Sequence, residues 1–175
     1  MSTAKSLEVL KRGMKTELWG QRFYREAVAR TESEDGKRVF QSLVDEEGKH
    51  LDILRGQYAS LSEQGGWVSP SHALEMAEAA ESTHIFPEAE DVEQLIADDT
   101  TDLGALEMAM EFERRGYEQY MDNAEDADSP EAQDLWRTLA DWEDQHFAFL
   151  QKSHDFLSSN GSWYFDEEEL PFFEG

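Results

Sequence analysis

Four residues of the types that bind metal ions or support metal sites occur twice in this sequence, 96 positions apart. The pairs are Glu17 and Glu113, Tyr24 and Tyr120, Glu47 and Glu143, and His50 and His146. In four-helix bundles, two metal ions are held by one glutamate on each of two helices and Glu-x-x-His on each of the other two. The repeated residues therefore predict a two-metal site inside a helical bundle.

The Glu-x-x-His spacing places Glu47 and His50 on one face of a helix, and that face is otherwise apolar. A single such pair is equally well explained by a core histidine that a nearby glutamate satisfies. The repeat changes this, because four carboxylates in one core repel each other strongly without cations. Two divalent ions balance four carboxylates. Carboxylates and imidazoles without sulfur favour iron or manganese, whereas zinc would bind without redox chemistry.

The apolar pattern predicts an all-α protein, an antiparallel four-helix bundle built from two duplicated helical hairpins and a long crossover. The expected bundle domain spans residues 1–160, with the crossover at 65–101 and an acidic, aromatic tail at 161–175. The expected long helices are Thr3–Arg30, Asp35–Glu63, Asp102–Ala124 and Pro130–Asn160, and a short helix is expected in the crossover at Ser71–Ser82. Trp67, Ile85, Phe86 and Pro87 are expected to attach the crossover to the bundle.

The duplication extends beyond the ligands. Between residues 10–54 and 106–150, eleven of 45 positions are identical, and most of them lie on the inward faces of the expected helices. The two halves should therefore pack with approximate two-fold symmetry. His72, His84 and His154 have no counterpart in this pattern, and we do not expect them to be ligands. Asp45 and Asp141 are repeated but lie off the inward face, so a surface or interface position is expected.

The chain has 40 acidic and 15 basic residues, a net charge of -25, which disfavours a nucleic-acid partner. Solubility, adaptation to high salt and attraction of cations are three explanations that composition leaves open. No apolar stretch is long enough for a membrane span, and the first residues lack the apolar core of a secretory signal, so we expect a cytoplasmic protein. With no cysteine, disulfides and thiolate metal sites are excluded.

Four segments together resemble the rubrerythrin-like branch of the di-iron ferritin-like proteins, over about residues 7–155. They are E-L-W-G-Q-R-F-Y at 17–24, D-E-E-G-K-H at 45–50, E-R-R-G-Y-E-Q-Y at 113–120 and D-W-E-D-Q-H at 141–146. The resemblance implies a ferritin-like four-helix bundle with two iron ions bridged by Glu47 and Glu143. It assigns the remaining ligands as Glu17 with His50 for one ion and Glu113 with His146 for the other. It also implies that Tyr24 and Tyr120 hydrogen-bond the ligand carboxylates.

Two departures from typical rubrerythrins matter. The chain carries no four-cysteine rubredoxin domain, so electrons have to come from an external electron donor protein. Gly116, matched by Gly20, stands where those proteins carry an additional glutamate that takes part in a ligand-switching peroxidase mechanism. A glutamate placed at 116 would be expected to project toward the same metal as Glu113, with overpacking as the risk.

We therefore expect an oxidoreductase that reduces peroxide or dioxygen, in a homo-oligomer that is a dimer or larger. The alternatives are a ferroxidase that stores or handles iron, and a metal-free structural bundle. Metal analysis separates the last of these from the other two.

Overall fold

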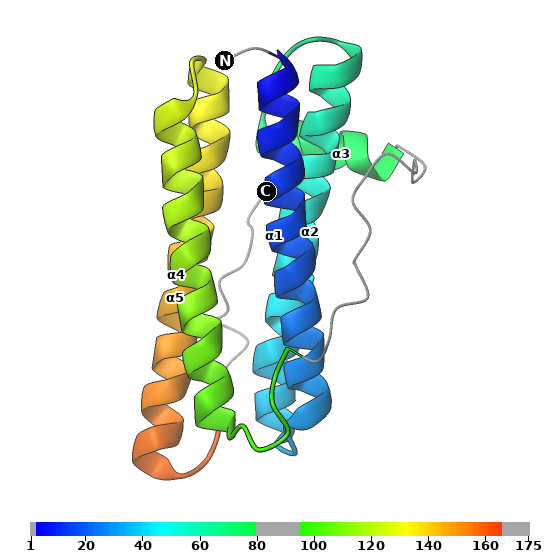
Figure 1. The fold of residues 1–175 in the computed structure, drawn as a ribbon. Helices are drawn as coiled ribbons and strands as arrows, with labels where there is room; N and C mark the ends of the chain where they lie inside the picture. Colours follow the sequence, from blue (N-terminus) through cyan, green and yellow to red (C-terminus); the bar gives the residue numbers. More distant parts are fainter. Residues whose placement is uncertain (1–2, 80–94, 166–175) are drawn as a thin grey trace.

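The structure, a computed structural model, describes residues 3–79 and 95–165. Its helices in chain order are α1 (Thr3–Arg30), α2 (Glu34–Glu63), α3 (Pro70–Ala79), α4 (Asp102–Asp126) and α5 (Pro130–Asn160). The four long helices lie side by side as two antiparallel hairpins, α1 with α2 and α4 with α5 (Figure 1). The predicted all-α four-helix bundle is confirmed, and the described residues contain no strand.

Local sequence signals set the helix ends. Ser33, Thr101 and Ser129 each precede a long helix and accept a hydrogen bond from a backbone N–H in its first turn. Helix α5 ends at Gly161, whose φ of 69° is the left-handed conformation that favours glycine. The expected long helices are thus confirmed to within two residues, while the crossover helix begins one residue earlier than expected and is described only as far as Ala79.

Helix α3 lies across the end of α2 (Figure 1). A Cβ atom at Gly56 would lie 1.7 Å from the carbonyl oxygen of Ala73, so α3 can approach α2 this closely only because residue 56 is glycine. Trp67 packs against the bundle core, as expected. Ile85, Phe86, Pro87 and His84 lie outside the described residues.

Two apolar layers fill the bundle at different heights. One layer contains Leu10, Met14, Leu54 and Trp136, and the other contains Phe40, Leu43, Leu106 and Leu150, among others. On each long helix, the repeated glutamates and histidines lie between these two layers. The apolar layers therefore exclude water above and below a single polar level.

The beginning of the C-terminal tail packs on its own bundle. The Trp163 indole stacks edge-on against Phe40 at 5.6 Å and donates its Nε1–H to Asp102 at 2.8 Å. Residues 166–175 lie outside the described part of the chain, so a separate tail segment stays a prediction. None of the helices in the described ranges combines the length and apolar composition that crossing a membrane requires.

Candidate metal centre

The polar level between the apolar layers receives side chains from all four long helices. Glu17 comes from α1, Glu47 and His50 from α2, Glu113 from α4, and Glu143 and His146 from α5. Each of these six side chains is at most 2% exposed. The structure therefore brings together every residue that the sequence predicts as a metal ligand.

The two histidines face the carboxylates in the same way. His50 Nδ1 lies 3.4 Å from Glu17 Oε2 and 3.3 Å from Glu143 Oε1. In the other half, His146 Nδ1 lies 3.4 Å from Glu113 Oε2 and 3.3 Å from Glu47 Oε1. Each imidazole thus points Nδ1 at one glutamate of its own hairpin and one glutamate of the opposite hairpin, as the two-fold repeat predicts.

These side chains form two overlapping groups whose ligand atoms lie within 4.8 Å of one another. One group is Glu17, Glu47, His50 and Glu143, and the other is Glu47, Glu113, Glu143 and His146. Glu47 and Glu143 belong to both groups. This is the position that a carboxylate has to occupy in order to bridge two metal ions.

Unpaired buried polar atoms are a second reason why the cluster fits a pair of cations. Several buried atoms of the cluster have no hydrogen-bond partner among the described residues: Glu17 Oε2, both Glu47 oxygens, both His50 nitrogens, Glu113 Oε2, Glu143 Oε2 and His146 Nδ1. A buried polar atom without a partner costs about 1–3 kcal/mol, and more when it is charged. Carboxylate oxygens and imidazole nitrogens in this number are suitable ligands for iron or manganese.

Two tyrosines connect the hairpins across the cluster. The Tyr24 hydroxyl on α1 donates to Glu113 Oε1 on α4, and the Tyr120 hydroxyl on α4 donates to Glu17 Oε1 on α1. Both tyrosines are fully buried. Each tyrosine hydrogen-bonds Oε1 of a glutamate that belongs to only one ligand group. The other oxygen, Oε2, faces a histidine of the cluster.

Burial and mutual repulsion shape the protonation of the metal-free cluster. Burial, together with Glu17, Glu143 and Glu113, holds the pKa of Glu47 well above its ordinary value. Burial and Glu113 do the same to the pKa of Glu143. Burial also opposes ionisation of Glu17, but His50, Glu47 and Tyr120 outweigh it and lower its pKa. Glu47 and Glu143 therefore retain their protons to higher pH than an ordinary glutamate does, and a bound cation would displace those protons.

Sequence reasoning missed Glu46, which is 6% exposed and forms a third close group with His50 and His146. Its carboxylate also pairs with Lys49 at 2.6 Å. Its counterpart in the repeat is Trp142, whose ring stacks on His50 at 5.1 Å. This difference between the two halves could have drawn attention to Glu46, since a carboxylate and an indole ring make different contacts with a histidine.

The two repeated glycines lie against the two shared glutamates. A Cβ atom at Gly116 would lie 3.0 Å from Glu143 Oε2, and one at Gly20 would lie 2.8 Å from Glu47 Oε2. A side chain at 116 therefore requires the Glu143 carboxylate to move by a few tenths of an ångström, so the overpacking risk noted from the sequence applies to a ligand itself. The missing side chains make room for the shared carboxylates.

The other candidates stand apart from the cluster, as expected. His72 is exposed and lies 3.4 Å from Glu75, and His154 lies 3.4 Å from Glu107. Neither belongs to a close group of potential ligands within the described residues. Asp45 and Asp141 are exposed at the surface.

Replacing Tyr24 with phenylalanine should weaken metal binding by about 10- to 100-fold, because Glu113 loses the hydroxyl that orients it. Tyr120→Phe should have a similar effect through Glu17. The affinity can be measured by competition between the protein and a coloured chelator for Co²⁺. Tyr117→Phe, at an exposed position, is the matched control. An unchanged affinity in both buried variants would contradict the orienting role.

Taken together, a four-helix bundle and a buried cluster of four glutamates and two histidines define a ferritin-like protein with a candidate two-metal centre. The family model described as Rubrerythrin matches residues 8–154. The chain therefore belongs to the rubrerythrin family, in agreement with the resemblance seen in its sequence. Searches among curated proteins and among solved structures gave no significant match.

Proposed function

We propose that this protein binds two iron ions and uses them to reduce hydrogen peroxide or dioxygen, with electrons from a separate donor protein. The observation that carries the proposal is the pair of overlapping ligand groups that share Glu47 and Glu143. Glu17 and His50 would complete the first ion's ligands, and Glu113 and His146 the second's. Membership of the rubrerythrin family supports a di-iron centre.

When bound, two ferrous ions would supply the two electrons that, together with two protons, reduce one hydrogen peroxide to two water molecules. The residues of the chain provide the setting. Four carboxylates offset the charge of the two cations, and the apolar layers around Leu54 and Leu43 keep bulk water away. Tyr24 and Tyr120 each hold a proton on the hydroxyl directed at a ligand glutamate, and thereby keep Glu113 and Glu17 in place.

A ferroxidase that stores or handles iron is the second candidate. The net charge of -25 favours it, because such a surface attracts cations. In that case Fe(II) is a substrate that is oxidised and then leaves the cluster, and no electron donor protein is needed.

Anaerobic loading with Fe(II) tests both functions. Two ions should bind per chain, and stopped-flow absorbance should then follow their oxidation by peroxide and by dioxygen. Complete oxidation by peroxide, followed by repeated cycles after chemical re-reduction without loss of iron, supports the peroxide-reducing function. Oxidation mainly by dioxygen with iron accumulating beyond two per chain supports the ferroxidase. A stoichiometry near zero would overturn both and leave a structural bundle.

A further inference from the structure

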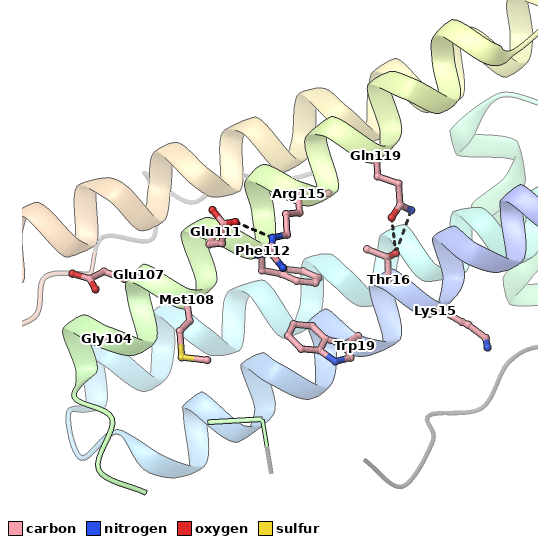
Figure 2. A pocket seen from close by; sticks show the side chains of 11 residues that line it. Lys15, Thr16, Trp19, Gly104, Glu107, Met108, Glu111, Phe112, Arg115 and Gln119 are labelled. Carbon is pink, nitrogen blue, oxygen red and sulfur yellow. Dashed lines mark hydrogen bonds and ion pairs between the residues drawn. The ribbon is translucent and has the colours of Figure 1, made fainter. Parts of the chain in front are cut away.

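A groove of about 750 Å³ lies between α1 and α4, outside the candidate metal centre (Figure 2). Trp19 from α1 and Phe112 from α4 face each other across it, with Met108 nearby on α4. Thr16 and Gln119 face each other farther along the groove and are joined by a hydrogen bond of 3.2 Å. The groove thus has an aromatic part and a polar part.

The wall of the groove includes Gly116, and Glu143 of the cluster lies against this glycine. The three atoms nearest to a Cβ placed at Gly116 all belong to Glu143, and the closest is Oε2 at 3.0 Å. That oxygen is buried and has no hydrogen-bond partner among the described residues. At this point the absence of a side chain brings the groove within contact distance of a shared ligand.

The equivalent position in the other half is closed. A Cβ at Gly20 would lie 2.7 Å from Phe112 Cε1 and 2.9 Å from its Cζ, so the ring of Phe112 covers Gly20 and, behind it, Glu47. Phe112 stacks on Trp19 at 5.1 Å, and Trp19 stacks on Phe23 at 6.0 Å. Three aromatic rings therefore seal the route to Glu47.

The sequence repeat shows where this asymmetry comes from. The three sealing rings have polar counterparts 96 positions away, and the pairs are Phe112 with Thr16, Trp19 with Arg115, and Phe23 with Gln119. The two-fold repeat relates Phe112 to Thr16 and Gly20 to Gly116. Thr16 is therefore placed relative to Gly116 as Phe112 is placed relative to Gly20. A small hydroxyl side chain thus replaces a phenyl ring at the position that would cover Gly116. The duplication is conserved at the ligands and broken at the three positions that decide whether the cluster is covered.

We propose that the polar part of this groove, over Gly116, is the route by which small polar solutes reach the cluster. The solutes are the hydrated divalent cation during loading and, on the basis of the proposed function, hydrogen peroxide. Thr16 and Gln119 are hydrogen-bonded to each other in this part of the groove, so it is the small size of Thr16, and not its hydroxyl, that leaves the route open. The groove carries two acidic residues, Glu107 and Glu111, and two basic ones, Lys15 and Arg115, so its formal charges balance.

Exchanging the residues between the two halves tests the route. Thr16→Phe should cover Gly116 as Phe112 covers Gly20, and the half-buried position of Thr16 beside an open groove gives the ring room. Phe112→Thr should open the sealed half. Thr16→Val is the matched control, because it removes the hydroxyl but adds no bulk. Circular dichroism and thermal melting check that each variant is folded.

The first measurement is the rate of Co²⁺ uptake by the metal-free protein, followed by stopped-flow absorbance, and it does not depend on any oxidation. Thr16→Phe should slow uptake about tenfold, or about 1.4 kcal/mol in activation free energy. Phe112→Thr should accelerate it, and Thr16→Val should stay near the parent. All variants should still bind two Co²⁺ per chain at equilibrium, because no ligand has changed. The rate of peroxide-driven oxidation of the Fe(II)-loaded protein should follow the same order.

Uptake rates that are equal in the parent, Thr16→Phe and Phe112→Thr would overturn the route. Slowing in Thr16→Val as large as in Thr16→Phe would also overturn it, since the hydroxyl and not the open space would then matter. A parent that takes up two Co²⁺ through this groove but is inert to peroxide as the ferrous protein would overturn the proposed peroxide reduction while leaving the route standing.

Discussion

Glu47→Ala is expected to abolish binding of both metal ions, whereas Glu17→Ala should leave one ion bound per chain. Glu47 belongs to both ligand groups, while Glu17 belongs to one. Removing a shared carboxylate takes a ligand and a negative charge from two cations at once, and it leaves each ion with one imidazole and two carboxylates, one of which the two ions still share. The two-fold repeat predicts the same contrast between Glu143→Ala and Glu113→Ala.

The measurement is the number of Mn²⁺ or Co²⁺ ions bound per chain, by calorimetric titration and by elemental analysis after desalting. Glu63→Ala, at an exposed position on the same helix as Glu47, controls for the loss of one surface charge. Glu47→Gln separates loss of charge from loss of volume, because it fills the same space. Equal stoichiometry in the Glu47 and Glu17 variants would argue against Glu47 as a bridge.

Much of the fold follows from signals that act within one helix. The positions of the apolar residues give the inward faces, and Ser33, Ser129 and Gly161 mark helix ends through local hydrogen bonds. The cluster is predictable for the same reason. Once Glu47 and His50 occupy the inward face of a helix whose other inward residues are apolar, a bundle has only its centre in which to place them.

The groove over Gly116 was not predicted, because it depends on how α1 and α4 pack against each other. The hairpin partners pack along their whole lengths, whereas α1 and α4 meet at fewer points. Whether a gap between two such helices is filled depends on the sizes of side chains such as Thr16 and Phe112. The helical pattern of apolar residues does not predict the sizes of these side chains. The differences within the repeat, and not its identities, carry this information.

Glu46 escaped prediction for a related reason. Three consecutive residues, Asp45, Glu46 and Glu47, are acidic, and the helical period assigns only Glu47 to the inward face. Glu46 is nevertheless buried. The buried surface of α2 at the height of the cluster is therefore wider than the one line of residues that includes Glu47. Sequence periodicity describes an average face and does not resolve its edges.

The metal-free protein should lose stability as the pH rises through the raised pKa values of Glu47 and Glu143. The pKa values of Glu47 and Glu143 are raised in the folded state above their ordinary value, so the folded protein binds more protons at these sites than the unfolded chain does. Their contribution is fully present below the ordinary glutamate pKa and is lost as the pH passes through the raised values. The slope is at most about 1.4 kcal/mol per pH unit for each group.

Glu17 and Glu113 act in the opposite sense at lower pH, since their pKa values are lowered in the folded state. The stability that they contribute is lost as the pH falls through those lowered values. The metal-free protein should therefore be most stable in a window that begins near the ordinary glutamate pKa and ends where Glu47 and Glu143 ionise. Metal binding should reverse the slope above this window, because cations bind the ionised carboxylates and release their protons.

Chemical denaturation at a series of pH values, with a chelator present or with Mn²⁺ in excess, measures both slopes. Glu47→Gln/Glu143→Gln is the matched control, because it removes the two groups with raised pKa values and leaves the surface charge unchanged. This control is needed because a protein with a net charge of -25 also gains stability when its exterior is protonated. The double variant should lose the decline in stability that the parent shows above the ordinary glutamate pKa and, with it, most of the stabilisation by Mn²⁺. If the metal-free double variant instead declined as steeply as the parent, the surface and not the buried cluster would be the source of the pH dependence.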